Sequence, residues 1–223
     1  MKILDKKNKI YLLDEENFNF PTLDMMKDDL VAVGGDFHPQ RLLNAYENGI
    51  FPWYIDEYNY IHWFSPQKRM IIKPEEMKVS KSLKKSVLNK GFVIKSNENF
   101  EAVMRNCSNI KRKHEDSTWI SEEFIQAYTD LHHLDIAFSI ECYLDEELVG
   151  GLYGLLIGDV FCGESMFAKV TDASKVAFYH LCQQAEKNGI KLIDCQVYND
   201  HLASLGAYEI TREDYFKILK ESF

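Results

Sequence analysis

In the second half of the chain, apolar runs separated by short polar segments predict neighbouring strands. Short apolar runs occupy residues 136–143, 148–158 and 160–167, and turn residues such as the LDEE tetrapeptide separate them. Runs of this length bounded by turns are typical of antiparallel strands connected as a meander.

A long helix is expected after the meander, from about Asp172 to Asn188, because helical spacing holds throughout and Gly189 is suited to end it. Another strand is expected from Leu192, and a last helix from Thr211 to the end of the sequence. A meander, one long helix and a strand that returns to the sheet predict an α+β fold.

The first third of the chain predicts a helix of its own. Pro39 suits the first turn of that helix and Gly49 suits its end. Its buried stripe is expected to contain Leu42, Leu43 and Tyr46.

The aromatic-rich stretch FPWYIDEYNYIHWFSP follows this helix. We interpret it as a domain junction, with a small N-terminal α/β domain over residues 1–64 and a larger domain over 65–223. The alternative is a plain aromatic core.

A further helix is expected after Ser121, which can cap it, and the two glutamates that follow suit its positive end. Phe124, Tyr128 and Leu131 have helical spacing and predict its buried face.

The strand expected at Leu192 contains two polar residues where a buried strand is normally apolar. Side chains two positions apart in an extended chain share a face, so Asp194 and Gln196 are expected side by side. Ile193, Cys195 and Val197 would then lie on the other face. The pair is either a hydrogen-bonded couple within the core or part of a functional site.

Composition places the chain among ordinary folded proteins, with 223 residues, 46% hydrophobic and 27% charged. No apolar run approaches the roughly 18–20 residues that span a bilayer, and the N-terminal stretch lacks the apolar core of a signal peptide. The five cysteines are odd in number and show no C-x-x-C spacing, which argues against a zinc site or a disulfide framework. We therefore expect a cytoplasmic protein without membrane association.

The net charge of −9 argues against a nucleic-acid partner, but the charge is unevenly distributed. Six lysines and no acid lie between Met77 and Asn97, and among them Lys81, Lys84 and Lys85 are spaced to share much of one helical face. This is either a solvated lysine face or a local patch for phosphates.

The order of elements resembles the GNAT acyltransferase fold. Members that use acetyl-CoA hold its pyrophosphate at a glycine-rich turn that begins the long helix, where backbone N–H groups and the helix dipole bind anions. The equivalent segment here, FAKVTDASKVAFYH, has no glycine and carries Asp172 at the helix start. A carboxylate there repels a pyrophosphate, so the acyl donor is expected to be something other than CoA.

Six phrases in order match one family. They are GGDFHPQRLLNAYENGIFPW, TWI, AFSIECYLDEELVGGLYG, FCGESMF, ASK and LIDCQVYNDHLASLGA. With them the chain resembles the leucyl/phenylalanyl-tRNA–protein transferase family from about Leu30 to Tyr215.

The resemblance implies a fold and an activity. Members have a GNAT-like catalytic domain preceded by a small N-terminal domain. They move leucine or phenylalanine, and sometimes methionine, from aminoacyl-tRNA to a protein with N-terminal lysine or arginine, which marks that protein for degradation by the N-end rule route. No CoA, metal or nucleotide triphosphate is implied, and we expect a monomer.

The resemblance also implies roles for the polar residues. Catalysis falls to Asp194 and Gln196, and we interpret Gln196 as a hydrogen-bond acceptor that orients the amine and is polarised by Asp194. Glu164, flanked by Gly163 and Ser165 in an expected central strand, belongs to the acceptor site, where an anion suits a cationic peptide terminus. Its alternative is a salt bridge to an internal lysine or arginine.

The donor amino acid is expected in an apolar pocket lined by Leu152, Phe178, Leu181 and Ile193, each of which also has an ordinary core interpretation. Trp53 and Trp119 match family aromatics near the terminal adenosine of the tRNA, where a ring can stack on the base. Lys81, Lys84 and Lys85 fall in a basic segment of the family and are expected to contact the tRNA body.

Three other functions compete with this one. A tRNA-dependent transferase that builds peptidoglycan precursors usually has two such domains and is longer. A transferase that adds leucine to N-terminal Asp or Glu would want cations facing its acceptor, whereas Glu164 and Asp194 are anions. An RNA-binding module without activity has no need of Asp194, Gln196 and Glu164.

Overall fold

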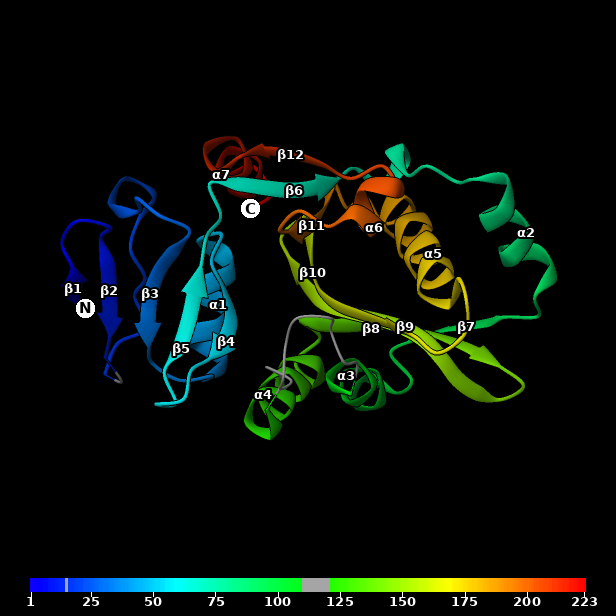
Figure 1. Cartoon of the computed structure of the whole chain (residues 1–223), viewed down its shortest axis with the longest axis horizontal. Helices are drawn as coiled ribbons and strands as arrows, with labels where there is room; N and C mark the ends of the chain where they lie inside the picture. The colour runs from blue at the N-terminus through cyan, green and yellow to red at the C-terminus, as the bar shows by residue number, and fades with distance from the viewer. Residues whose placement is uncertain (15, 110–120) are drawn as a thin grey trace.

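The computed structural model describes residues 1–14, 16–109 and 121–223. Two β-sheets organise the described chain, one of five strands in the order β1-β2-β3-β5-β4 and one of seven in the order β12-β6-β11-β10-β9-β8-β7 (Figure 1). The strands of the first sheet are β1 (Lys2–Asp5), β2 (Ile10–Leu13), β3 (Leu30–Gly34), β4 (Phe51–Ile55) and β5 (Ile61–Phe64). The strands of the second are β6 (Lys68–Ile72), β7 (Val93–Ser96), β8 (Ala137–Leu144), β9 (Glu147–Ile157), β10 (Val160–Ala168), β11 (Leu192–Gln196) and β12 (Tyr208–Thr211).

Helices cover both faces of the seven-stranded sheet. The α-helices are α1 (Pro39–Glu47), α2 (Lys81–Asn89), α3 (Phe100–Ser108), α4 (Glu122–His133), α5 (Ala173–Lys187), α6 (Asp200–Ser204) and α7 (Arg212–Lys220), and two 3₁₀ turns occupy Leu23–Met25 and Pro74–Glu76. Helix α5 packs on one face, with α2 beside it, while α3 and α4 pack on the other (Figure 1). None of the helices in the described chain is long and apolar enough to span a membrane.

Helix α1 forms where the sequence predicts it. Pro39 occupies its first turn, and Gly49 follows it with a φ of +63°, a left-handed conformation that glycine adopts easily. Leu42 and Tyr46 are buried, and Leu43 is half-buried against the core. The predicted apolar stripe is therefore the face by which α1 joins the core.

The aromatic-rich stretch forms the hairpin of β4 and β5. Trp63 is fully buried and donates its indole N–H to the Gly34 carbonyl at 2.8 Å, whereas Tyr58 at the hairpin tip is exposed. One hydrophobic cluster contains Trp63 of β5 and Tyr215 of α7, so the two sheets share a core. The division into residues 1–64 and 65–223 stays a prediction, and it falls in the link between β5 and β6.

The α+β class and the expected order of elements are confirmed. Strands β8, β9 and β10 pair in antiparallel succession, α5 follows, and β11 returns parallel to β10. Ser121 caps α4 by accepting from the Phe124 N–H at 3.1 Å, and Phe124, Tyr128 and Leu131 are buried. This is the meander–helix–strand order that the resemblance to the GNAT fold implied.

The stretch from Leu192 to Ala207 is not one strand. Strand β11 ends at Gln196, and the short helix α6 begins after Asn199, whose side chain accepts from the N–H groups of His201 and Leu202. Strand β12 then pairs with β6 before Thr211 caps α7. The asparagine cap of α6 therefore ends the extended segment shortly after Gln196.

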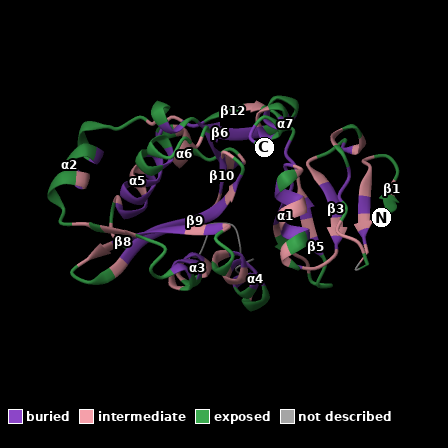
Figure 2. Cartoon of the chain, turned by 180° about the vertical axis from the view of Figure 1, so that it is seen from behind, coloured by how far each residue is buried: buried purple, intermediate pink, exposed green. Residues whose placement is uncertain are grey.

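Burial differs between the inner strands and the ends of the molecule. Buried residues concentrate on β6, β9 and β10, which are inner strands of the larger sheet, while exposed residues gather on β1 and α2 at the two ends of the molecule (Figure 2). Helix α7 lies over the junction between the sheets (Figure 1), where Arg212 donates to the Asp28 carbonyl at 2.7 Å. The two sheets are thereby connected by polar as well as apolar contacts.

Candidate functional site

A cavity of about 530 Å³ opens where β10 and β11 separate. The two strands pair over only three positions, the last of which joins Cys162 to Asp194. The pairing of β10 with β9 shifts register between Gly163 and Ser165, and the pairing of β11 with β6 shifts between Asp194 and Gln196. Two bulges side by side bend the strands apart, and the volume is in the range of small-molecule sites.

The bulge in β11 corrects one prediction. Gln196 has a φ of +64°, so the strand does not alternate regularly there and the side chains of Asp194 and Gln196 are not simply side by side. Asp194 Oδ1 instead accepts from the backbone N–H of Gln196 at 2.9 Å, while the Gln196 side chain turns to Glu164. A left-handed non-glycine residue is strained, and such residues cluster at functional sites.

Asp194 forms a fully buried ion pair with Arg69 of β6. The Arg69 Nε and Nη2 groups donate to its two carboxylate oxygens at 2.8 and 2.6 Å, and the Tyr215 hydroxyl donates at 2.9 Å. With the Gln196 N–H, four donors reach a group with about four acceptor positions. The charge of Asp194 is thus compensated inside the protein.

Arg69 also joins the two sheets. Its third nitrogen donates to the Gly49 carbonyl at 3.0 Å, and its guanidinium carbon lies 4.8 Å from the centre of the Phe51 ring and 4.4 Å from that of Tyr215. Burial opposes the charged form, but the neighbouring Asp194 outweighs it and raises the pKa of Arg69. A buried pair with this many contacts fixes β6, β11 and the chain after α1 relative to one another.

Glu164 of β10 has different surroundings. It is half-buried, its Oε1 accepts from the Gln196 amide at 2.6 Å, and it also accepts from the Tyr46 hydroxyl. Burial and then the charge of Asp194 raise the pKa of Glu164 to about 7, while the hydrogen bonds from Tyr46 and Gln196 limit the rise. The salt bridge considered for Glu164 does not occur within the described chain; Asp194 has one instead.

The Tyr46 hydroxyl continues into the core. It lies 2.5 Å from the Tyr128 hydroxyl of α4, and both rings are buried. Burial raises the pKa of both hydroxyls well above the usual range, so both keep their protons. Because Tyr46 donates to Glu164, Tyr128 donates to Tyr46, and this chain holds the Glu164 carboxyl in place.

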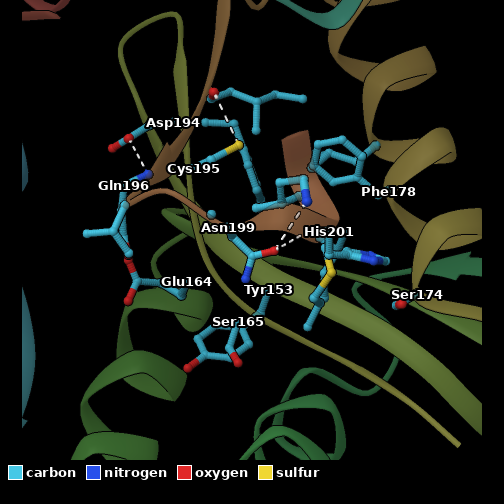
Figure 3. A pocket seen from close by; sticks show the side chains of 18 of the residues that line it. Tyr153, Glu164, Ser165, Ser174, Phe178, Asp194, Cys195, Gln196, Asn199 and His201 are labelled. Carbon is cyan, nitrogen blue, oxygen red and sulfur yellow. Dashed lines mark hydrogen bonds between the residues drawn. The ribbon is translucent and has the colours of Figure 1, made fainter. Parts of the chain in front are cut away.

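The opposite end of the cavity is apolar. Leu152, Phe178, Leu181 and Ile193 line it, all four are buried, and all belong to the hydrophobic cluster between the sheet and α5. Figure 3 shows Glu164 next to Gln196 on one side of the cavity and Phe178 on the other. The structure therefore brings the residues predicted for the donor pocket and for catalysis into one cavity with a polar end and an apolar end.

The residues predicted to contact tRNA fall in three places. Trp53 lines the cavity and packs edge-on against Phe64, with ring centres 4.7 Å apart. Trp119 lies outside the described residues. Lys81, Lys84 and Lys85 are exposed on α2, which packs beside α5 and does not line the cavity.

Sequence reasoning missed the residues that hold these side chains. Arg69 is 125 positions from Asp194, and Tyr46 is 82 positions from Tyr128. One local signal was present, because Arg69 directly precedes the apolar run Met70–Ile72, and a charged residue next to a buried strand needs a partner. The identity of that partner is not encoded locally.

A carboxylate side chain, that of Asp172, lies at the start of α5. Asp172 precedes the helix with a φ of +73°, and its carboxylate accepts from the Ser86 hydroxyl at 2.8 Å and from Lys90 at 3.3 Å. The place where a GNAT fold binds pyrophosphate is therefore next to a carboxylate that also tethers α2. No cluster of three or more His, Cys, Asp or Glu residues in the described chain is arranged to hold a metal ion.

Comparison with known proteins points to one family. The family model for leucyl/phenylalanyl-tRNA protein transferase matches residues 71–220, and the model for the N-terminal domain of that transferase matches residues 35–67. A leucyl/phenylalanyl-tRNA–protein transferase of Flavobacterium johnsoniae is 48% identical over 211 residues, covering 95% of this chain and 99% of the relative. One from Sulfurimonas denitrificans is 50% identical over 205 residues, covering 92% and 88%.

Solved structures resemble the chain more distantly. FemX aligns with a TM-score of 0.49 at 11% identity, over 80% of this chain and 70% of that one, and a GCN5-related N-acetyltransferase from Kribbella flavida aligns with a TM-score of 0.40 at 12% identity, over 73% and 57%. Neither likeness is close enough to carry an argument. The family models and the relatives are sufficient: the chain belongs to the leucyl/phenylalanyl-tRNA–protein transferase family.

Proposed function

We propose that this protein transfers leucine or phenylalanine, and also methionine, from aminoacyl-tRNA to the α-amine of proteins that begin with lysine or arginine. The observation that carries the proposal is that one cavity has both an apolar end and an acidic end, in a chain about half identical to transferases of that name. The new N-terminus is a degradation signal of the N-end rule type.

The chemistry requires alignment more than activation. The aminoacyl ester is already activated, so its conversion to an amide needs no further energy source. The α-amine has a reference pKa of about 7.7–8.0, so part of it is neutral near pH 7. The protein then has to hold the ester carbonyl and the amine together and to help a proton leave. A cavity that binds both substrates meets the first requirement.

The two ends of the cavity suit the two substrates. Leu152, Phe178, Leu181 and Ile193 offer an apolar surface for the side chain of the donor amino acid. A pocket of this kind discriminates weakly, since one methylene is worth about 1–3 kcal/mol, so leucine, phenylalanine and methionine are all expected to serve as donors. Glu164 supplies the anion for a cationic acceptor terminus.

Asp194 and Gln196 divide the catalytic work between them. The Gln196 amide donates to Glu164, which leaves its amide oxygen to accept from the incoming amine and to orient it. Asp194 touches the Gln196 backbone and is enclosed by Arg69 and Tyr215, so it acts as a positioning residue. Its contact with Gln196 runs through the backbone and not through the amide that it was expected to polarise.

The body of the tRNA is held outside the cavity. We assign stacking on the terminal adenosine to Trp53, which lines the cavity, with Trp119 as its sequence-predicted partner. Lys81, Lys84 and Lys85 have no acidic partner among the described residues and are available for phosphates of the tRNA body. Phosphate contacts position without reading sequence, so discrimination falls to the acylated end.

The remaining assignments follow from the reaction. A cytoplasmic location suits an enzyme that consumes aminoacyl-tRNA, and no disulfide joins the cysteines of the described chain, as is usual in a reducing compartment. We propose a monomer that needs no cofactor or metal, with a small N-terminal domain over residues 1–64 and the catalytic domain over 65–223.

The test is transfer of radiolabelled leucine from charged tRNA to two peptides that differ only in an N-terminal arginine or aspartate. We expect label on the arginine peptide alone. Label on the aspartate peptide would keep the reaction class and overturn the acceptor assignment, and no transfer to either peptide would overturn the function. A Glu164→Gln variant that still binds tRNA but transfers poorly would exclude a simple RNA-binding module.

A further inference from the structure

Two acids line the cavity among the described residues, and only one of them can exchange a proton with a substrate. Asp194 is completely buried and receives four hydrogen bonds from Arg69, Tyr215 and the Gln196 N–H. Those donors use the acceptor capacity of its two oxygens. Glu164 is half-buried and, within residues 1–14, 16–109 and 121–223, accepts from Gln196 and Tyr46 only, so it keeps acceptor capacity toward the cavity.

The Gln196 amide is not an alternative proton acceptor, because a neutral amide is a very weak base. Its Nε2 is 2.6 Å from Glu164 Oε1. An amine that donates to the Gln196 amide oxygen is therefore placed beside the Glu164 carboxylate. Orientation by Gln196 and proton acceptance by Glu164 are then two functions of one hydrogen-bonded pair.

We propose that Glu164 is the general base of the transfer reaction, accepting a proton from the attacking nitrogen and returning it to the leaving ribose oxygen. This assignment rests on the proposed aminoacyl transfer. It deepens the acceptor role of Glu164, since the same carboxylate that faces the cationic terminus also handles its proton. Asp194 exchanges no proton in this scheme and holds Gln196 in its left-handed conformation.

The protons balance in three steps. The incoming α-ammonium first loses one proton to water. The neutral amine attacks the ester carbonyl carbon, the N–C bond forms, and the nitrogen gives a second proton to Glu164. The C–O bond to the tRNA ribose then breaks, and Glu164 gives that proton to the departing oxygen. The third proton stays on the amide nitrogen, and Glu164 ends in its starting ionisation state.

The acidity of Glu164 suits this task. A general base works best when its pKa is near the working pH, and the pKa of Glu164 is raised to about 7 by burial and by the charge of Asp194. A glutamate with the ordinary pKa of about 4.3 is a far weaker base. The surroundings therefore raise the basicity of Glu164 while leaving a large fraction ionised at neutral pH.

Among the described residues, the phenols and the thiol around Glu164 do not compete in this range. They are Tyr46 on α1, Tyr128 on α4 and Cys162 on β10, and the Asp194–Arg69 ion pair of β11 and β6 lies nearby. Burial raises the pKa of both tyrosines and of Cys162 well above the usual range, so they stay neutral. Tyr46 and Tyr128 are buried, so their hydroxyl chain ends in the core and serves to orient Glu164.

The experiment measures single-turnover transfer from leucyl-tRNA to a saturating arginine peptide between pH 5.5 and 9, with the full-length protein. The wild-type rate needs both an ionised Glu164 and a neutral amine, so below about pH 7 it is expected to fall by nearly 100-fold per pH unit. Glu164→Gln is expected to react about 100-fold more slowly at pH 7.5 and to fall only tenfold per unit, because only the amine still titrates.

Two further variants test the pH profile: one is expected to shift it and the other is a control. Tyr46→Phe removes a hydrogen bond that lowers the pKa of Glu164, so the pH at which the wild-type profile steepens is expected to move upward while activity persists at high pH. Glu186→Gln changes an exposed glutamate of α5 and is expected to leave rate and profile unchanged. A folded Glu164→Gln protein is recognised by circular dichroism and by tRNA binding.

The outcomes separate the inference from the function. If the wild type transfers leucine but Glu164→Gln only raises the KM for the peptide, with the saturated rate and its pH dependence unchanged, Glu164 binds the acceptor and is not the base. A Tyr46→Phe profile that steepens at the wild-type pH would also overturn the assignment. Absence of transfer by the wild type itself would overturn the proposed function.

Discussion

Strands β10 and β11 each carry an acid where the two strands separate, and the two acids have opposite surroundings. Asp194 is enclosed by a guanidinium, a phenol and a backbone N–H, whereas Glu164 is half-buried between an amide and a phenol. The charge of Asp194 is compensated and serves the architecture, whereas Glu164 is only about half ionised at pH 7. Partners, more than residue type, set the role of an acid in this cavity.

The largest effect on stability is expected from removing Arg69, the cation that pairs with Asp194. Arg69→Met leaves a buried carboxylate without its partner and breaks the contact with the Gly49 carbonyl, so the free energy of unfolding should fall by about 3–5 kcal/mol. Urea denaturation measures the loss. Adding Asp194→Asn to this variant should recover part of it, and a double variant as unstable as the single one would show that the ion pair is not what matters.

The second effect is the contribution of Glu164 to the pH dependence of the free energy of unfolding. The pKa of Glu164 is raised from 4.5 to about 7 on folding, so its contribution to stability is full below pH 4.5 and is lost as the pH rises through 7. The wild type should therefore lose up to about 3 kcal/mol relative to Glu164→Gln between pH 4.5 and 8. Urea denaturation of both proteins across this range tests the sign; a constant difference would contradict it.

A third, smaller effect compares the two phenols. Tyr215→Phe removes a hydrogen bond of 2.9 Å to the compensated acid and should cost about 1.5 kcal/mol of unfolding free energy without moving the pH profile of transfer. Tyr46→Phe, the matched change beside Glu164, should move that profile upward. Thermal denaturation and single-turnover assays on both variants make the comparison, and a shift in the Tyr215→Phe profile would count against the division of roles.

The smallest effect on the transfer reaction is expected from changing the lysines of α2. Changing Lys81, Lys84 and Lys85 together to alanine should raise the KM for aminoacyl-tRNA and make binding less sensitive to salt, because phosphate contacts are lost. The single-turnover rate at saturating tRNA should stay the same, since these lysines do not line the cavity. A lower saturated rate would mean that α2 influences the chemistry.

Much of the fold could be predicted from periodicity and capping alone. Pro39 and Gly49 bound α1, Ser121 caps α4, and the three apolar runs form β8, β9 and β10 as expected. Strands β1 and β2 were not predicted, because charges scattered through the N-terminal stretch obscure their alternation. Strand β12 was hidden because its residues are largely exposed and show no buried face.

The residues of the site could be predicted from the sequence, but the hydrogen bonds and ion pairs that connect them could not. Resemblance to the family supplied Asp194, Gln196, Glu164 and the apolar lining, all of which meet in one cavity. The ion pair with Arg69 and the hydrogen bond from Tyr46 depend on contacts between distant parts of the chain, and the left-handed backbone of Gln196 breaks the period of two on which the strand prediction rested. Tertiary contacts, absent from any local pattern, decided which acid remained open.

The most direct test of the difference between the two acids is a titration of Glu164 itself. Protein labelled with ¹³C at the glutamate side-chain carboxyls can be followed by NMR from pH 4 to 9, with Glu164→Gln identifying the signal that disappears. We predict a midpoint near pH 7 for that signal, set by burial and the charge of Asp194. A midpoint near the ordinary value of about 4.3 would contradict the account, because Glu164 would then be as ordinary an anion as any on the surface.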